Sequence, residues 1–182
     1  MRNPRANDAD RFFSFPNPVN EKAARTVAGG VLVVSLAILL LSLAAANRWL
    51  WLCAVLAYGF LARVVAGPRL SPLGQFATRI IAPRLGAATM VAGPPKRFAQ
   101  SIGLLVTSTI LALVAAGDYG AAQILLAVMV VFAALESIVA YCVGCKVFAG
   151  LIRLGVIPQS ICLECADVTR RARPDRTAPA AG

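Results

Sequence analysis

Four of the five cysteines in this chain fall into two pairs of identical spacing. Cys142 and Cys145 form the first pair, and Cys162 and Cys165 repeat the spacing after sixteen intervening residues. The full pattern, Cys-x2-Cys-x16-Cys-x2-Cys, lies in the range that is typical of a four-cysteine zinc site. Cysteines three residues apart also share one face of a helix, which suits thiol–disulfide exchange.

Three interpretations of these cysteines stay open. All four are zinc ligands, or Cys142 and Cys145 are a redox or sulfur-handling dithiol, or the cysteines lie incidentally on helix faces. The regular spacing argues against the third. Gly155 is a natural helix stop midway between Cys145 and Cys165, so a helical hairpin that turns there would bring the pairs together. Lys146 favours the thiolate form that both working roles need.

Two charged residues stand out within apolar stretches, Arg63 and Glu136. An ionisable residue inside a membrane is costly and usually has a partner. At a rise of 1.5 Å per residue both lie about 20 Å into their helices, so we expect them to form an ion pair. The alternative is a proton or substrate path. Cys53 stands alone and is expected to be a small core residue.

The composition predicts a membrane protein. Hydrophobic residues make up 59% of the chain and charged residues only 14%, whereas soluble proteins are about 45–50% apolar and about 25% charged. The formal net charge is +10, but the basic residues lie between apolar runs and no nucleic-acid motif is recognisable. The charge therefore indicates membrane orientation and attraction to lipid headgroups, with no nucleic-acid partner. The chain has no histidine, the usual metal ligand and general base.

Four apolar stretches are long enough to cross the hydrocarbon core as helices. The predicted spans cover residues 27–46, 49–66, 98–117 and 121–145. Short turns join them into two hairpins. Between the hairpins, apolar residues at i, i+3, i+4, i+7 and i+8 predict an amphipathic interfacial helix over residues 72–82, which begins after Ser71 and ends at Pro83.

Basic residues precede the first span, fill the long connection and follow the fourth span, while the two short turns hold Arg48 alone. The positive-inside rule then places both termini and the connection in the cytoplasm. The predicted fold class is an all-α integral membrane protein with a cytoplasmic, cysteine-containing C-terminal hairpin. Residues 1–15 are predicted to be a disordered tail, 16–155 the membrane domain, and 156–182 a basic tail with the second cysteine pair.

Several motifs together resemble those of a bacterial four-span membrane family known only as a domain of unknown function. They are Asn17-Pro18-Val19-Asn20, Ser71-Pro72-Leu73-Gly74, Ala82-Pro83-Arg84-Leu85, Lys96-Arg97-Phe98-Ala99-Gln100 and Cys142-Val143-Gly144-Cys145. The resemblance covers residues from about 15 to about 155. It implies four spans, a membrane location and an association with thioredoxin-like or rhodanese-like proteins. We expect the membrane to be the bacterial cytoplasmic (inner) membrane. It implies no settled activity.

These observations favour a membrane protein whose cytoplasmic-side CxxC…CxxC thiol site is redox-active, sulfur-handling or metal-binding and works with a thioredoxin-like or sulfurtransferase partner. In the redox or sulfur-handling case, Cys142 and Cys145 are the working pair. One alternative is a non-enzymatic scaffold in which zinc binds Cys142, Cys145, Cys162 and Cys165. Another is a small transporter subunit that uses Arg63 and Glu136 and forms a homo-oligomer, because four spans enclose little volume. Whether the protein is an enzyme, and on what substrate, stays open.

Overall fold

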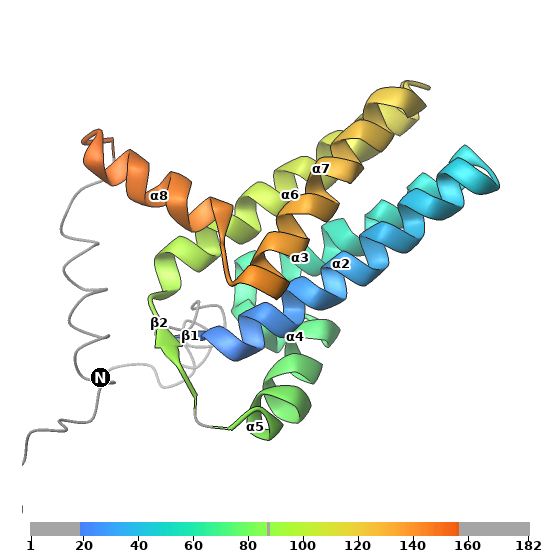
Figure 1. The fold of residues 1–182 in the computed structure, drawn as a ribbon. Coiled ribbons are helices and arrows are strands. Elements are labelled where there is room, and N and C mark those ends of the chain that lie inside the picture. Colours follow the sequence, from blue (N-terminus) through green and yellow to red (C-terminus); the bar gives the residue numbers. More distant parts are fainter. Residues whose placement is uncertain (1–18, 87, 157–182) are drawn as a thin grey trace, which may run out of the picture.

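The fold is a bundle of two helical hairpins whose turns point the same way (Figure 1). The computed structural model describes residues 19–86 and 88–156, so the predicted tail over 1–15, Cys162 and Cys165 lie outside the described residues. The first hairpin contains α2 (Glu21–Ala44), η1 (Asn47–Leu52) and α3 (Cys53–Ala66), and the second contains α6 (Gly93–Ala115) and α7 (Tyr119–Val139).

The described residues include four helices that are long and apolar enough to cross a membrane. Large apolar side chains cover the outside of the bundle: Val33, Leu105 and Ile138 are 67%, 67% and 70% exposed. Such an outer surface is stable only against an apolar solvent such as lipid. The structure therefore confirms the predicted all-α, four-span membrane architecture.

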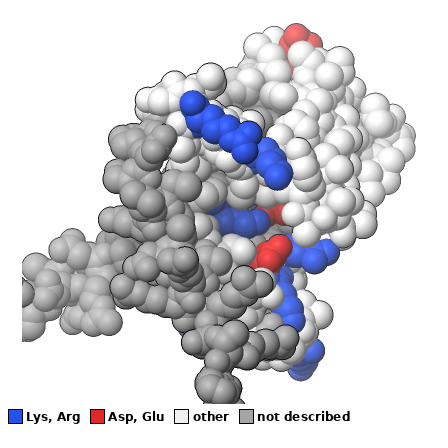
Figure 2. All heavy atoms as spheres, turned by 60° about the vertical axis from the view of Figure 1, so that its left-hand side comes forward, with Lys and Arg blue, Asp and Glu red and all other residues white. Residues whose placement is uncertain are grey.

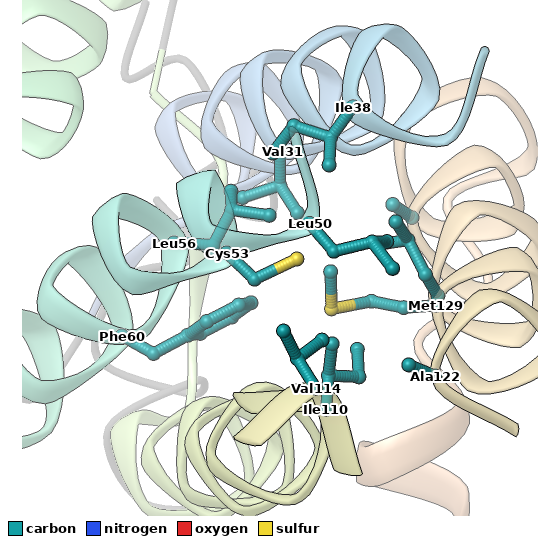
Figure 3. Close-up of a cluster of buried hydrophobic side chains, with 12 residues drawn as sticks. Val31, Ile38, Leu50, Cys53, Leu56, Phe60, Ile110, Val114, Ala122 and Met129 are labelled. Carbon is teal, nitrogen blue, oxygen red and sulfur yellow. The ribbon is translucent and has the colours of Figure 1, made fainter. Parts of the chain in front are cut away.

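The two hairpins are paired crosswise, since α2 packs mainly along α7 and α3 packs mainly along α6. Figure 3 shows the core that these four helices share. Its fully or almost fully buried side chains include Val31, Ile38, Leu50, Leu56, Phe60, Ile110, Val114 and Leu126. Because lipid is as apolar as these side chains, close packing rather than escape from water holds the helices together.

Basic side chains of one hairpin bind the carbonyl ends of helices in the other. Arg97 Nε donates to the Val64 carbonyl oxygen near the end of α3, at 3.1 Å. Arg25 Nη2 donates to the carbonyl oxygens of Ser137 and Ile138 near the end of α7, at 3.2 and 3.1 Å. The last carbonyls of a helix have no partner within it and carry partial negative charge. These arginines therefore stabilise helix ends as well as carrying positive charge.

The connection between the hairpins is helical from Pro72 to Arg84, as α4 (Pro72–Phe76), η3 (Ala77–Ile81) and α5 (Ala82–Arg84). We predicted that this helix ends at Pro83, but it continues for one residue beyond. A π-helical turn precedes the proline, so Pro83 falls in the first turn of α5, where proline is tolerated. A short antiparallel pairing of β1 (Val19–Asn20) with β2 (Met90–Val91), which we did not predict, brings the start of α2 beside this connection.

The prediction of one continuous helix over residues 121–145 is wrong. α7 ends at Val139, and Ala140 has a positive φ of 58°. The Tyr141 amide then donates back to the Leu135 carbonyl oxygen at 3.0 Å, which closes the helix end. A non-glycine residue in this conformation costs about 1–2 kcal/mol, so tertiary contacts must hold the break. The contacts of Arg25 with the end of α7 are among them.

Candidate thiol site

Cys142 and Cys145 lie at the start of a separate helix, α8 (Val143–Arg153), and not at the end of the fourth span. Cys142 is the N-cap residue and is 8% exposed, Cys145 is partly buried, and both are free thiols. The Cys145 thiol donates a hydrogen bond to the Cys142 sulfur. The free amides at a helix start and the helix dipole favour a thiolate there.

Gly144 explains how α8 is held in place. A Cβ at this position would lie 2.6 Å from the Cβ and 2.8 Å from the Cα of Ala99 on α6. Only glycine therefore allows α8 to approach α6 so closely. One turn further on, the rings of Phe148 and Phe98 are in contact, with centroids 5.5 Å apart. The glycine of the Cys-Val-Gly-Cys motif thus fixes the position of the thiols against the bundle.

Glu136 forms an ion pair with Lys96, with Oε1 and Nζ 2.8 Å apart and side chains 18% and 12% exposed. The predicted pair between Glu136 and Arg63 is therefore wrong. The reason is the pairing of the helices: α3, which carries Arg63, packs along α6, and α6 presents Lys96 to α7. Lys96 and Glu136 lie almost equally far from the turn at Gly117, which is the sequence signal that we missed.

Arg63 is 5% exposed and ties α3 to its neighbours. Its Nε donates to Gln100 Oε1 at 2.7 Å, and its Nη1 donates to Ser71 Oγ at 3.1 Å. Its guanidinium also lies 4.7 Å from the centre of the Phe60 ring. Ser71 Oγ accepts a further bond from the Gly74 amide as the N-cap of α4. Arg63 thus joins α3, α6 and the connection through one buried hydrogen-bond network.

The surroundings of the pair favour ionisation of Cys142. The hydrogen bond from Cys145 and the charge of Lys96 lower the pKa of Cys142 to about 7, against the opposing effects of burial and of Glu136. The pKa of Cys145 is raised, because its thiol donates that hydrogen bond and is buried. Near neutral pH about half of Cys142 is then thiolate, the nucleophilic form. The site can therefore attack a disulfide or another electrophilic sulfur.

A cavity of about 300 Å³ lies within the bundle and reaches Cys142. Its walls are apolar except near the thiol pair, where Gln100 and Glu136 also line it. A second cavity of about 260 Å³ is lined by Arg63, Lys96 and again Gln100. Sequence reasoning missed both cavities, because they arise from the crosswise pairing of the hairpins.

The zinc hypothesis needs residues that the structure does not describe. Within residues 19–86 and 88–156, no three His, Cys, Asp or Glu side chains are grouped so as to hold a metal ion. Cys162 and Cys165 lie outside these ranges, so the four-cysteine zinc site stays a prediction. Cys53 is fully buried in the core, as predicted, and is shown beside Leu56 in Figure 3.

The fold defines a multi-pass membrane protein with a CxxC pair at the start of an additional helix. The chain matches the family model of a domain of unknown function, DUF4395, over residues 19–153. Because the match covers well over half of the chain, this protein belongs to that family. Comparisons with curated proteins and with solved structures give no match.

Proposed function

We propose that this protein is a membrane-embedded thiol–disulfide exchange protein, with Cys142 as the attacking thiol and Cys145 as the resolving thiol. The observation that carries the proposal is the placement of the pair. Cys142 is the N-cap residue of α8, accepts a hydrogen bond from Cys145, and is held against α6 by the contact between Gly144 and Ala99. A structural core cysteine such as Cys53 has none of these features.

The exchange with a thioredoxin-like partner has two steps. The Cys142 thiolate attacks the partner's disulfide, which forms a mixed disulfide and releases one partner thiolate. The Cys145 thiolate then attacks the Cys142 sulfur, which forms the Cys142–Cys145 disulfide and releases the second partner thiolate. The two protons from the cysteine pair end on the partner's thiols. A rhodanese-like partner would instead transfer its outer sulfur to Cys142, leaving a Cys142 persulfide and the partner's thiolate.

The proposed location is the bacterial cytoplasmic membrane, with both termini and the thiol pair on the cytoplasmic side. The support is the distribution of charge. On the face shown in Figure 2, Lys and Arg side chains lie in one band together with acidic side chains, and the broad area beside this band is uncharged except for an acidic side chain at its far edge. Arg25, Lys96 and Arg97 lie at the same end of the bundle as the thiols, which the positive-inside rule assigns to the cytoplasm. Cytoplasmic thiols are kept reduced, so the pair would be catalytic or transient rather than a structural disulfide.

The two other hypotheses have less support among the described residues. The zinc scaffold depends on Cys162 and Cys165. Transport through Arg63 and Glu136 would need a shared path, but Arg63 lines one cavity and Glu136 the other. Both side chains are also bound to protein groups. A homo-oligomer stays a prediction.

The test is a redox titration of the purified full chain in glutathione buffers, with the thiols trapped by alkylation and counted by mass. Cys162→Ser and Cys165→Ser are made in the background, so that only the first pair is observed. We expect two thiols to be lost together in one reversible transition. Cys142→Ser and Cys145→Ser should each abolish it, and the matched control Cys53→Ser should leave it unchanged.

The proposal fails if the pair stays reduced across the whole titration. In the native background, one zinc ion per chain that is lost on changing any of the four paired cysteines would establish the scaffold instead.

A further inference from the structure

We propose that the cavity beside Cys142 binds the head group of a lipid-soluble quinone, which accepts the electrons of the thiol pair. This inference rests on the proposed thiol exchange and adds its membrane-side reaction partner. Three features support a quinone: the chemistry of the cavity walls, the access from lipid, and the electron balance.

The cavity has the polarity that a quinone head group requires. Its volume of about 300 Å³ is at the small end of ligand pockets, enough for a ring with its substituents but not for a long tail. Val31, Val106, Met129 and Phe60 contribute to its apolar walls. A pocket of this kind accepts a flat apolar ring.

The polar groups of the cavity lie together at the end where the thiols are. Gln100, Glu136 and Cys142 come from α6, the end of α7 and the start of α8. Gln100 Oε1 is held by Arg63 Nε at 2.7 Å, which leaves the Gln100 amide N–H groups as donors for a carbonyl oxygen. A quinone carbonyl would therefore be oriented toward the reacting sulfur.

Part of the cavity wall also belongs to the outer surface of the bundle. Val128 and Phe132 line the cavity and are 41% and 42% exposed. Both residues lie in the middle of α7, at a depth where lipid chains surround the helices. A passage between these two side chains would admit a ligand sideways from the membrane and leave its isoprenoid tail among the lipids.

The ability to accept electrons distinguishes a quinone from an ordinary lipid as a ligand of this cavity. An acyl chain would also fill an apolar cavity, but it takes no electrons. The Cys142 and Cys145 thiols lose two electrons and two protons as the bond between their sulfurs forms. The quinone ring takes up the two electrons, its two carbonyl oxygens take up the two protons, and the product leaves as the quinol. Thiol–disulfide exchange is reversible, so the resulting disulfide can then oxidise a reduced thioredoxin-like partner. This step is the reverse of the exchange described above, and it regenerates the dithiol.

The experiment follows quinone reduction by the pre-reduced full chain in detergent. The probe is decyl-ubiquinone, whose ring has no unsubstituted position to which a thiol could add, and the loss of its ultraviolet absorbance is recorded. Cys162→Ser and Cys165→Ser are again made in the background. We expect one quinol per cysteine pair and no quinol from Cys142→Ser.

Two variants fill the cavity at buried alanines, Ala133→Phe and Ala28→Leu. Each should slow quinone reduction about tenfold or more by removing the space for the ring. The glutathione titration of each variant should be unchanged, which shows that the variant folds and keeps its dithiol. The matched control is Ala37→Leu, at an exposed position of α2 outside the cavity, and should react like the parent chain.

The outcomes separate the two proposals. If the glutathione titration shows the reversible disulfide but quinone is not reduced, or is reduced equally by Ala133→Phe, Ala28→Leu and Ala37→Leu, the quinone site is refuted and the thiol exchange stands. If no reversible disulfide forms with glutathione, the proposed function itself fails.

Discussion

Replacement of Gly144 by alanine tests how the thiols are positioned. The new Cβ would lie 2.6 Å from the Cβ and 2.8 Å from the Cα of Ala99. Carbon atoms in contact prefer about 3.5–4.0 Å, so the two helices would have to separate by about 1 Å. Backbone atoms of a helix cannot turn aside as a flexible side chain can. We therefore expect α8 to move away from α6 and to carry Cys142 with it.

The expected cost follows from two opposing effects. Overpacking of a closely packed contact costs about 1–3 kcal/mol. Alanine in place of glycine inside a helix stabilises the folded state by about 0.5–1 kcal/mol, which offsets part of this cost. The net loss in the free energy of unfolding should be about 0–2.5 kcal/mol. The assay is unfolding in mixed detergent micelles, together with the alkylation rate of Cys142, which should change as Lys96 and the bundle no longer face the thiol.

Gly150 provides a matched control in the same helix. A Cβ there meets no atom within 4 Å. Gly150→Ala should therefore stabilise the protein by about 0.5–1 kcal/mol and leave thiol reactivity unchanged. Equal effects of Gly144→Ala and Gly150→Ala would refute the view that the motif glycine sets the distance between α8 and α6.

Two further predictions concern charge. Lys96→Met and Glu136→Gln should show a coupling of about 0.5–3 kcal/mol in a double-mutant cycle of unfolding free energies, and the cycle of Arg63→Met with Glu136→Gln should show less. A larger coupling to Arg63 would contradict the observed pairing. The pKa of Cys142 is lowered from its ordinary value of 9.0 to about 7, so its alkylation rate should rise with pH through a midpoint near 7. Cys145→Ala removes the hydrogen-bond donor and should move this midpoint upward. Because the folded pKa is the lower one, the stability contributed by the thiolate is fully present above about pH 9 and is lost as the pH falls through about 7.

The spans could be predicted because a helix that crosses the lipid core must be apolar along its length. A run of uncharged residues about 20 long has few alternatives to a membrane helix. Glu21–Ala44 and Gly93–Ala115 accordingly contain most of the predicted spans 27–46 and 98–117, each beginning several residues earlier. These extra turns contain charged residues such as Arg25 and Lys96, which a search for uncharged runs leaves out. The family was also recognisable, since its short motifs are spread along the whole membrane domain.

The thiol site could be predicted only in part. The spacing of Cys142 and Cys145 identified the two residues of the site, but it did not predict the break in the helix before them. Ala140 carries no turn signature, and its conformation depends on contacts with residues far away in sequence, such as Arg25 with the end of α7. Propensity and hydropathy are local, so they favoured an unbroken helix through the motif.

The partner of Glu136 was predictable in principle. Helices joined by a tight turn bring together residues equally distant from it, and this rule selects Lys96. Depth along separate spans, which suggested Arg63, says nothing about which helices are neighbours. The cavity beside Cys142 could not be predicted, because its shape depends on how five helices pack.

The reciprocal arginine contacts have a consequence for biosynthesis. The ribosome makes Arg97 after it has made α3. Until then, the Val64 carbonyl oxygen near the end of α3 lacks its arginine hydrogen-bond donor. The later half in turn needs Arg25, which was synthesised first. Neither half is complete without the other, and a split version of this protein should accumulate only when both pieces are produced together.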